Sequence, residues 1–77
     1  MENQKVVIVL DGFNPIYIDH TVLINGNSYL DHCDRSLLDF AYDEIFDNKP
    51  IIQVSNSEGE YVFPVSKILL LKQYKEI

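Results

Sequence analysis

The residues with the clearest arrangement for binding chemistry are carboxylates spaced at intervals of four. The row consists of Asp39, Asp43 and Asp47. On a helix, side chains at this spacing lie on one side, about 5–6 Å apart, and like charges there repel one another. Phe40 and Phe46 flank the row, and Glu44 lies near its edge. Such a face predicts attraction to a positive surface.

The acidic row favours binding over catalysis. A line of negative charge on a rigid helix resembles a nucleic-acid strand, and it suits a basic groove of a DNA- or RNA-processing protein. The phenylalanines would add desolvated anchors. The alternative is a solvated helix face, with both phenylalanines in a small core. The predicted partner-binding residues are Asp39, Phe40, Asp43, Glu44, Phe46 and Asp47.

Metal and thiol chemistry have little support in the sequence. Zinc needs about four ligands at compatible spacing, and one Cys with two His lacks that spacing. Cys33 and His32 are adjacent, so on a strand their side chains would point apart. His20 falls on an apolar strand face and is predicted to be a core histidine. We therefore expect no metal, no cofactor and no catalytic residue, and we predict that the protein is not an enzyme.

Length and charge limit the class of protein and partner. The 77 residues, read as a single domain over 1–77, carry 12 Asp and Glu against 6 Lys and Arg. The net charge of −6 disfavours direct binding to nucleic acid or to an anionic membrane. A basic protein is the natural complement. The plainer alternative is that the charge only keeps a small domain soluble.

The compartment is predicted from the cysteine and from the N-terminus. A single Cys, at position 33, excludes an internal disulfide and does not favour a secreted scaffold. The apolar run at residues 6–10 is too short for a signal peptide or a membrane span. We expect a cytoplasmic protein.

The first half of the chain predicts three strands. Residues 5–10 form a continuous apolar run that is typical of a strand buried on both faces. Residues 16–24 alternate, which predicts one strand with a single core face. Asn25-Gly26 is a strong hairpin signal, so residues 28–31 are expected to pair back as a third strand.

A helix is predicted to follow this hairpin. Asp34 is the expected N-cap, with Asp31 as a rival one turn earlier. The pattern continues to about Phe46, and Pro50 ends the segment. The expected core-facing stripe consists of Leu37, Leu38, Ala41, Tyr42 and Ile45.

The second half predicts three more strands, at residues 51–54, 60–65 and 68–74, with a corner at 65–67. Pro64 favours an edge position or a bend in the strand. The stretch at residues 61–71 is strongly apolar, so it is either an interface for a homo-oligomer, formed by edge pairing or sheet stacking, or a central strand buried on both sides. The order β-β-β-α-β-β-β predicts an α+β fold, with a small curved, mostly antiparallel sheet or open barrel and one helix packed across it.

The four residues Ala41-Tyr42-Asp43-Glu44 resemble a stretch of the phage inhibitors of uracil-DNA glycosylase, which are small acidic β-rich proteins that imitate DNA. The likeness covers four residues of 77, and those inhibitors begin with helices whereas this chain begins with predicted strands. No site residue is carried over from it. It favours the class of proteins that mimic DNA. Small size and acidic charge then lead us to expect a phage or mobile-element inhibitor that mimics nucleic-acid charge; the alternative is a structural or regulatory module that self-associates through a sheet edge.

Overall fold

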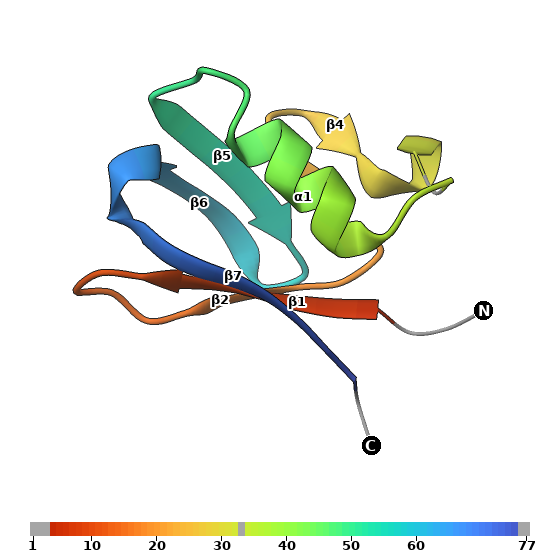
Figure 1. Ribbon diagram of the computed structural model, residues 1–77, viewed down its shortest axis with the longest axis horizontal. Coiled ribbons are helices and arrows are strands. Elements are labelled where there is room, and N and C mark those ends of the chain that lie inside the picture. The colour runs from red at the N-terminus through yellow and green to blue at the C-terminus, as the bar shows by residue number, and fades with distance from the viewer. Residues whose placement is uncertain (1–3, 33, 76–77) are drawn as a thin grey trace.

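The chain forms two antiparallel sheets with one helix packed against them (Figure 1). The computed structural model describes residues 4–32 and 34–75. Within this part of the chain, seven strands form a three-stranded and a four-stranded sheet, and there is one α-helix. The sheets do not close into a barrel. The predicted α+β class, with a curved antiparallel sheet or open barrel, is confirmed.

The three-stranded sheet has β1 (Gln4–Leu10) at its centre. β1 pairs antiparallel with β2 (Ile16–Ile18) on one side and with β7 (Ile68–Lys75) on the other. Val7 is buried on one face of the sheet. The other face buries Val6, Ile8 and Leu10. The strand predicted at residues 5–10 is therefore confirmed, but its second face is only partly covered, because Lys5 and Val9 are half-buried.

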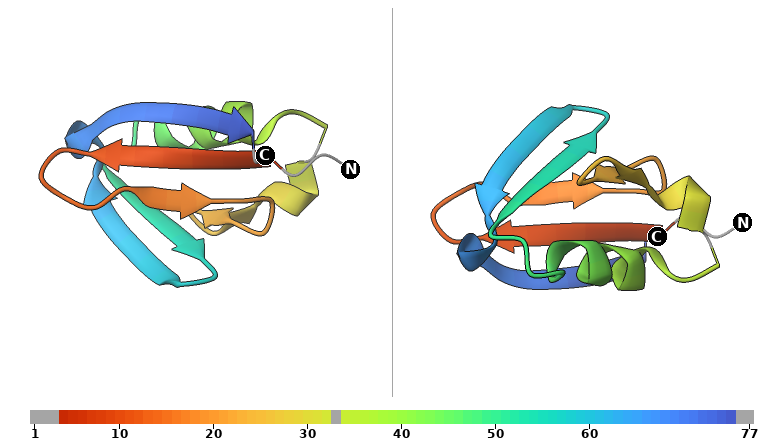
Figure 2. Two further views of the ribbon diagram at one scale, coloured as in Figure 1. Left: turned by 90° about the horizontal axis from the view of Figure 1, so that it is seen from below. Right: turned by 90° about the horizontal axis from the view of Figure 1, so that it is seen from above.

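The four-stranded sheet has the order β4-β3-β5-β6. It contains β3 (Leu23–Ile24), β4 (Asn27–Ser28), β5 (Ile51–Asn56) and β6 (Gly59–Pro64). Figure 2 shows β5 and β6 running obliquely to β1, β2 and β7, so the two sheets cross. β6 is an edge strand, which confirms the position predicted from Pro64: proline lacks a backbone N–H and is tolerated where no neighbour needs one.

The strands predicted at residues 51–54, 60–65 and 68–74 are present with their ends shifted by a residue or two. The corner between the last two is a 3₁₀ helix, η2 (Val65–Lys67). β7 pairs with β1 and lies at the edge of its sheet, and the side chain of Leu69 is 65% exposed. The alternative of a central strand buried on both sides is therefore wrong.

The strand predicted over residues 16–24 is broken in the middle. The Asp19 carboxylate accepts hydrogen bonds from the backbone N–H and the hydroxyl of Thr21, and the Asp19 carbonyl accepts from the N–H of Val22. This local turn replaces strand pairing, as short polar side chains often do. His20 lies in the turn and is only half-buried, so the prediction of a core histidine is wrong.

The predicted hairpin at Asn25-Gly26 is confirmed, because both residues have positive φ, 54° and 82°. The third strand expected at residues 28–31 is wrong beyond its first residue. The chain turns instead into a 3₁₀ helix, η1 (Tyr29–His32). The Ser28 hydroxyl accepts a hydrogen bond from the N–H of Leu30, at 3.2 Å, and so favours the turn over continued pairing.

The helix α1 (Leu37–Ile45) is capped by Ser36, whose hydroxyl accepts a hydrogen bond from the N–H of Asp39, at 3.1 Å. The predicted caps Asp34 and Asp31 are wrong. Each lies too early in the chain for a helix that begins at position 37, and Asp31 is part of η1.

A hydrogen-bond network sets the start of α1. The Tyr29 hydroxyl donates to the Arg35 carbonyl at 2.6 Å. The side-chain oxygen of Gln4, on β1, accepts from the N–H of Leu37 at 2.7 Å, and the Gln4 amide nitrogen donates to the Tyr29 hydroxyl at 3.3 Å. These bonds tie the residues before the helix to the sheet, so the chain becomes helical only after position 36.

The core lies between the two sheets and α1, and α1 contacts β7, β1 and β3. Figure 2 shows the helix over β7. The helix covers the core on this side, which leaves its outer face free to form a surface. The buried core residues are Val6, Ile8, Leu10, Ile16, Ile18, Val22, Ile24, Tyr29, Leu37, Phe40, Ala41, Ile45, Ile52, Val54 and Phe63.

The hydrogen bonds in the turn at Asp19 predict that the stability of the fold depends on pH. The Thr21 hydroxyl donates to the carboxylate at 2.6 Å and lowers the pKa of Asp19 below its ordinary value of 3.8. A lowered pKa contributes stability above the ordinary pKa and loses it as pH falls through the folded-state pKa. We expect Thr21→Val to raise the pKa of Asp19, as measured by NMR titration of the carboxyl carbon. Thr21→Ser keeps the hydroxyl donor and should leave the pKa of Asp19 low. Equal pKa values of Asp19 in the two variants would contradict the assignment of the shift to this hydroxyl.

Candidate functional site

Two of the predicted acidic residues form a row on the outer side of α1. Asp39 and Asp43 are exposed and lie one helical turn apart. Asp47 is also exposed, but the helix ends at Ile45, so its predicted place in a helical row is wrong. The reason is local: Asn48 has a φ of 58°, in the left-handed region, which does not continue a right-handed helix.

The acidic residues differ in how far they are neutralised. The Arg35 guanidinium forms an ion pair with the carboxylate of Asp43. This pair is partly exposed and contributes at most about 1 kcal/mol to the stability of the fold. It also lowers the net negative charge at Asp43. Among the described residues, the carboxylates of Asp39 and Asp47 have no ion pair, so they are the ones available to a cationic partner.

Glu44 has a structural task as well as a charge. Its carboxylate accepts a hydrogen bond from the side-chain amide of Asn27 at 2.7 Å, and its carbonyl accepts one from Asn25 at 2.9 Å. It is half-buried against the β3–β4 hairpin. Through these hydrogen bonds Glu44 positions α1 against the hairpin. Its carboxylate is therefore less accessible to a partner than the predicted binding role requires.

The predicted aromatic anchors fall on opposite sides of the helix. Phe40 is fully buried against Tyr29, with ring centroids 5.5 Å apart, so its predicted role as a surface anchor is wrong. Phe46 is 48% exposed and can fill that role. Tyr42, expected in the core stripe, is 59% exposed and packs its ring on Phe46 at 5.1 Å. Burial of Phe40 turns Tyr42 outward because the two differ by about 160° around the helix.

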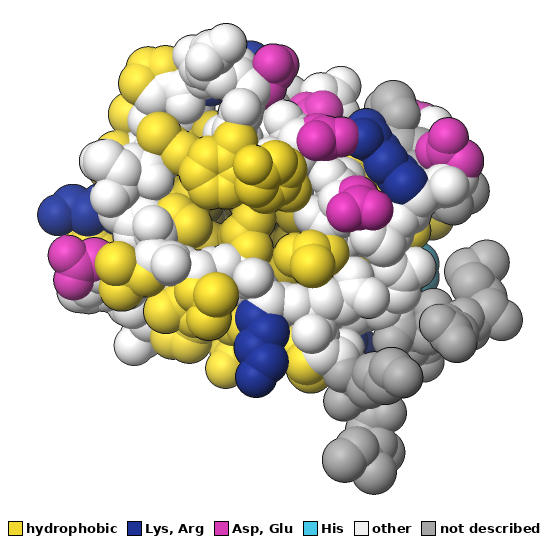
Figure 3. Space-filling model, viewed as in Figure 1, with side chains coloured by type: hydrophobic (Ala, Val, Ile, Leu, Met, Phe, Trp, Pro, Cys, Tyr) yellow, Lys and Arg dark blue, Asp and Glu magenta, His cyan; other side chains and the backbone are white. Residues whose placement is uncertain are grey.

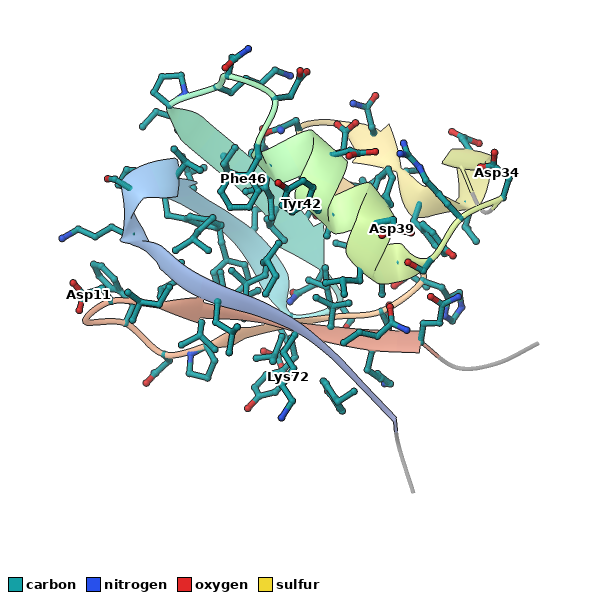
Figure 4. The ribbon with its side chains drawn as sticks, in the orientation of Figure 1. Asp11, Asp34, Asp39, Tyr42, Phe46 and Lys72 are labelled. Carbon is teal, nitrogen blue, oxygen red and sulfur yellow. The ribbon has the colours of Figure 1, made fainter. Side chains whose placement is uncertain are left out.

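The exposed rings belong to an apolar surface shared with the last strand. Figure 4 shows Tyr42 and Phe46 together on α1, with Asp39 nearer the helix start. An open hollow of about 270 Å³ lies between these rings and β7. Figure 3 shows a continuous apolar area here, with acidic side chains bordering it on the α1 side. We call it the α1–β7 patch; its residues are Tyr42, Phe46, Ile68, Leu69, Leu70 and Leu71.

The patch extends toward the end of the helix. A second open hollow, of about 560 Å³, is lined by Ile45, Phe46, Asn48, Lys49, Pro50 and Val65. The turn after α1 therefore leaves Phe46 with hollows on two sides. An aromatic ring in this position can enter the surface of another protein with little reorganisation.

Sequence reasoning missed Tyr42 as a surface residue and left open whether Leu69 is exposed. The positions 37, 41 and 45 fit two apolar stripes equally well, one completed by Leu38 and Tyr42 and the other by Phe40. The sequence signal that could have selected the second stripe is that Phe40 is wholly apolar, whereas Tyr42 carries a hydroxyl. For Leu69, the register shift between β1 and β7 beside it is a tertiary feature that no local pattern predicts.

The described residues show no grouping for metal or cofactor chemistry. In residues 4–32 and 34–75, no three His, Cys, Asp or Glu side chains gather to hold a metal ion. Cys33, considered for metal or thiol chemistry, lies outside the described residues, and the side chain of His32 is not described. No helix in the described parts is long and apolar enough to cross a membrane.

Comparison with protein-family models, with curated proteins and with solved structures finds no match for this chain.

The two phenylalanines of the predicted site should respond differently to truncation. We expect Phe40→Ala to lower the free energy of unfolding by about 3–5 kcal/mol, because it leaves a cavity in the core. Phe46→Ala should cost less than about 1 kcal/mol, because that ring already faces solvent. Urea unfolding followed by circular dichroism measures both, and similar losses in the two variants would contradict the assigned orientation of α1.

Proposed function

We propose that the protein is a small non-catalytic binding protein that docks through the outer side of α1 onto a basic protein. The observation that carries this proposal is the placement of the exposed Tyr42–Phe46 pair beside the carboxylates of Asp39 and Asp43 on one helix. Aromatic anchors that a partner can desolvate, bordered by charge, are the usual composition of an energetic centre in protein interfaces.

Charge supports a nucleic-acid-processing protein as the partner. The net charge of −6 attracts a basic groove and repels phosphate, so the protein competes with DNA or RNA rather than binding it. Asp39 and Asp47 supply the charges without an ion pair among the described residues. A cytoplasmic phage or mobile-element inhibitor that occupies such a groove is the biological form of this proposal.

Affinity in such a complex would come from two sources with different salt dependence. The carboxylates speed association and confer selectivity for a basic surface, and salt screens them. The apolar contact of Tyr42 and Phe46 depends little on salt and slows dissociation. Loss of the rings and loss of the charges should therefore have separable effects.

A pull-down from host lysate tests the proposal with matched charge variants. We expect Asp39→Lys, Asp43→Lys and Asp47→Lys together to abolish capture of a DNA- or RNA-handling protein. The control reverses Asp31, Asp34 and Glu58, which are also exposed but line neither hollow of the patch, and should retain most of the capture.

Washing at high salt should release the captured protein, and circular dichroism must show both variants folded. Equal capture by the two charge variants would refute the docking face. The double variant Tyr42→Ala with Phe46→Ala should still bind the partner at low salt but should lose it during low-salt washing, because the rings slow dissociation.

A second candidate function is self-association through β7. The observation that favours it is the unpaired edge of this strand, on which Leu69 is 65% and Leu70 51% exposed. Sedimentation equilibrium distinguishes the two functions. A salt-insensitive dimer that Leu69→Lys dissociates would support self-association, whereas a monomer at all concentrations would exclude it.

A further inference from the structure

An open groove runs between β6 and the loop that joins β1 to β2, on a different part of the molecule from the α1–β7 patch. It encloses about 580 Å³ and has residues 13–16 on one wall and residues 60–64 on the other. Successive side chains of a strand point to opposite faces of the sheet. A groove that touches five consecutive residues of β6 therefore follows the edge of the strand rather than one of its faces.

The backbone of β6 can be oriented from its pairing with β5. Both the N–H and the carbonyl of Gln53 are bonded to Asn25, so they point away from β6. Gln53 stands opposite Val62. In an antiparallel pair, opposed residues exchange both hydrogen bonds or neither, and the two cases alternate. Val62, and Glu60 two residues earlier, thus direct their N–H and carbonyl groups toward the open edge.

The side chains of the groove select a particular kind of ligand. Phe13 is 64% and Val62 66% exposed, so both leave apolar surface without a covering neighbour. The charged residues among those that line the groove are Glu58 and Glu60, and no cation stands with them. Apolar walls with two carboxylates at the rim match a ligand that is part apolar and part cationic.

We propose that this groove binds an extended peptide segment in which Lys or Arg alternates with apolar residues, added as a further strand on β6. The backbone groups of Glu60 and Val62 supply the ladder. Glu60 and the exposed Val62 share one face of β6, where basic side chains of the segment meet Glu60 with their charges and cover Val62 with their aliphatic stems. Apolar side chains on the other face meet Tyr61 and Phe13, because cross-strand neighbours share a face. The segment is short, since Pro64 has no N–H and ends the ladder.

A second copy of the chain does not fit this edge. Pairing β6 with another β6 would bring together two acidic edges, because Glu58 and Glu60 are the charged residues that line the groove and no cation lines it with them. Each copy also carries a net charge of −6. The same charges attract a basic segment. The proposal does not depend on the docking role of α1.

The test uses an acetylated and amidated heptapeptide that alternates Val and Lys, titrated into the isotope-labelled protein and followed by NMR. Addition as a strand should slow hydrogen exchange at the amides of Glu60 and Val62. A heptapeptide alternating Val and Glu should not bind. Failure of the Lys peptide to bind, or binding that leaves these two amides unprotected, would overturn the proposal.

Two matched pairs of variants separate strand addition from charge attraction. Val62→Pro removes an edge N–H that β5 does not use and should weaken the Lys peptide by about tenfold, whereas Val62→Ala keeps that N–H and should change the affinity far less. Glu58→Lys with Glu60→Lys should weaken it more than Asp31→Lys with Asp34→Lys, which alters the net charge equally. Equal effects within either pair refute the site.

Phe46 does not line the groove, so Phe46→Ala serves as a control and should leave the affinity for the Lys peptide unchanged. This separates failure at the groove from failure of the proposed docking face on α1.

Discussion

The orientation of α1 about its own axis is the constraint on which the rest of the surface depends. A 77-residue chain has little core, and the burial of Phe40 fixes this orientation. A fully buried phenylalanine contributes about 1.5–3 kcal/mol and needs no polar partner. Burying Tyr42 instead would require a hydrogen-bond partner for its hydroxyl in the core. The helix therefore turns its tyrosine outward, beside the carboxylates.

The two incomplete sheets determine where another chain can attach. A closed barrel has no edges, but here β6 and β7 are both terminal strands. The edge of β7 lies next to aromatic rings of α1, while β6 borders an open groove with carboxylates. Both edges offer unpaired backbone groups, but the side chains around them differ. The edge of β7 therefore suits an apolar partner, and the edge of β6 suits a basic one.

Charge is distributed unevenly over this framework. Four of the five lysines lie on β1, η2 and β7, whereas carboxylates gather on α1 and at the β5–β6 turn. Net charge alone therefore understates the local field near α1 and β6. The ion pair between Arg35 and Asp43 moderates this field at one point and shows that a row of acids in sequence is not a row of equal charges in space.

Strands with strong local patterns were predictable from the sequence. The apolar run of β1, the Asn25-Gly26 hairpin and the edge position implied by Pro64 all express backbone preferences of the residues themselves. Predictions were wrong where local patterns admit two solutions. The alternation over residues 16–24 did not reveal that Asp19 would bond to Thr21, and Ser36 capped the helix where two aspartates were expected.

The sequence by itself determined the α+β class, the order of the main elements and the acidity of the helix. Tertiary structure decided which aromatic residue of α1 is buried, which carboxylate is neutralised, and which strand edges stay open. The physical reason is that composition and periodicity act between near neighbours in the chain. The rotation of a helix and the pairing of edges depend on contacts between segments that are distant in sequence, and many patterns satisfy those contacts equally well until the whole core is packed.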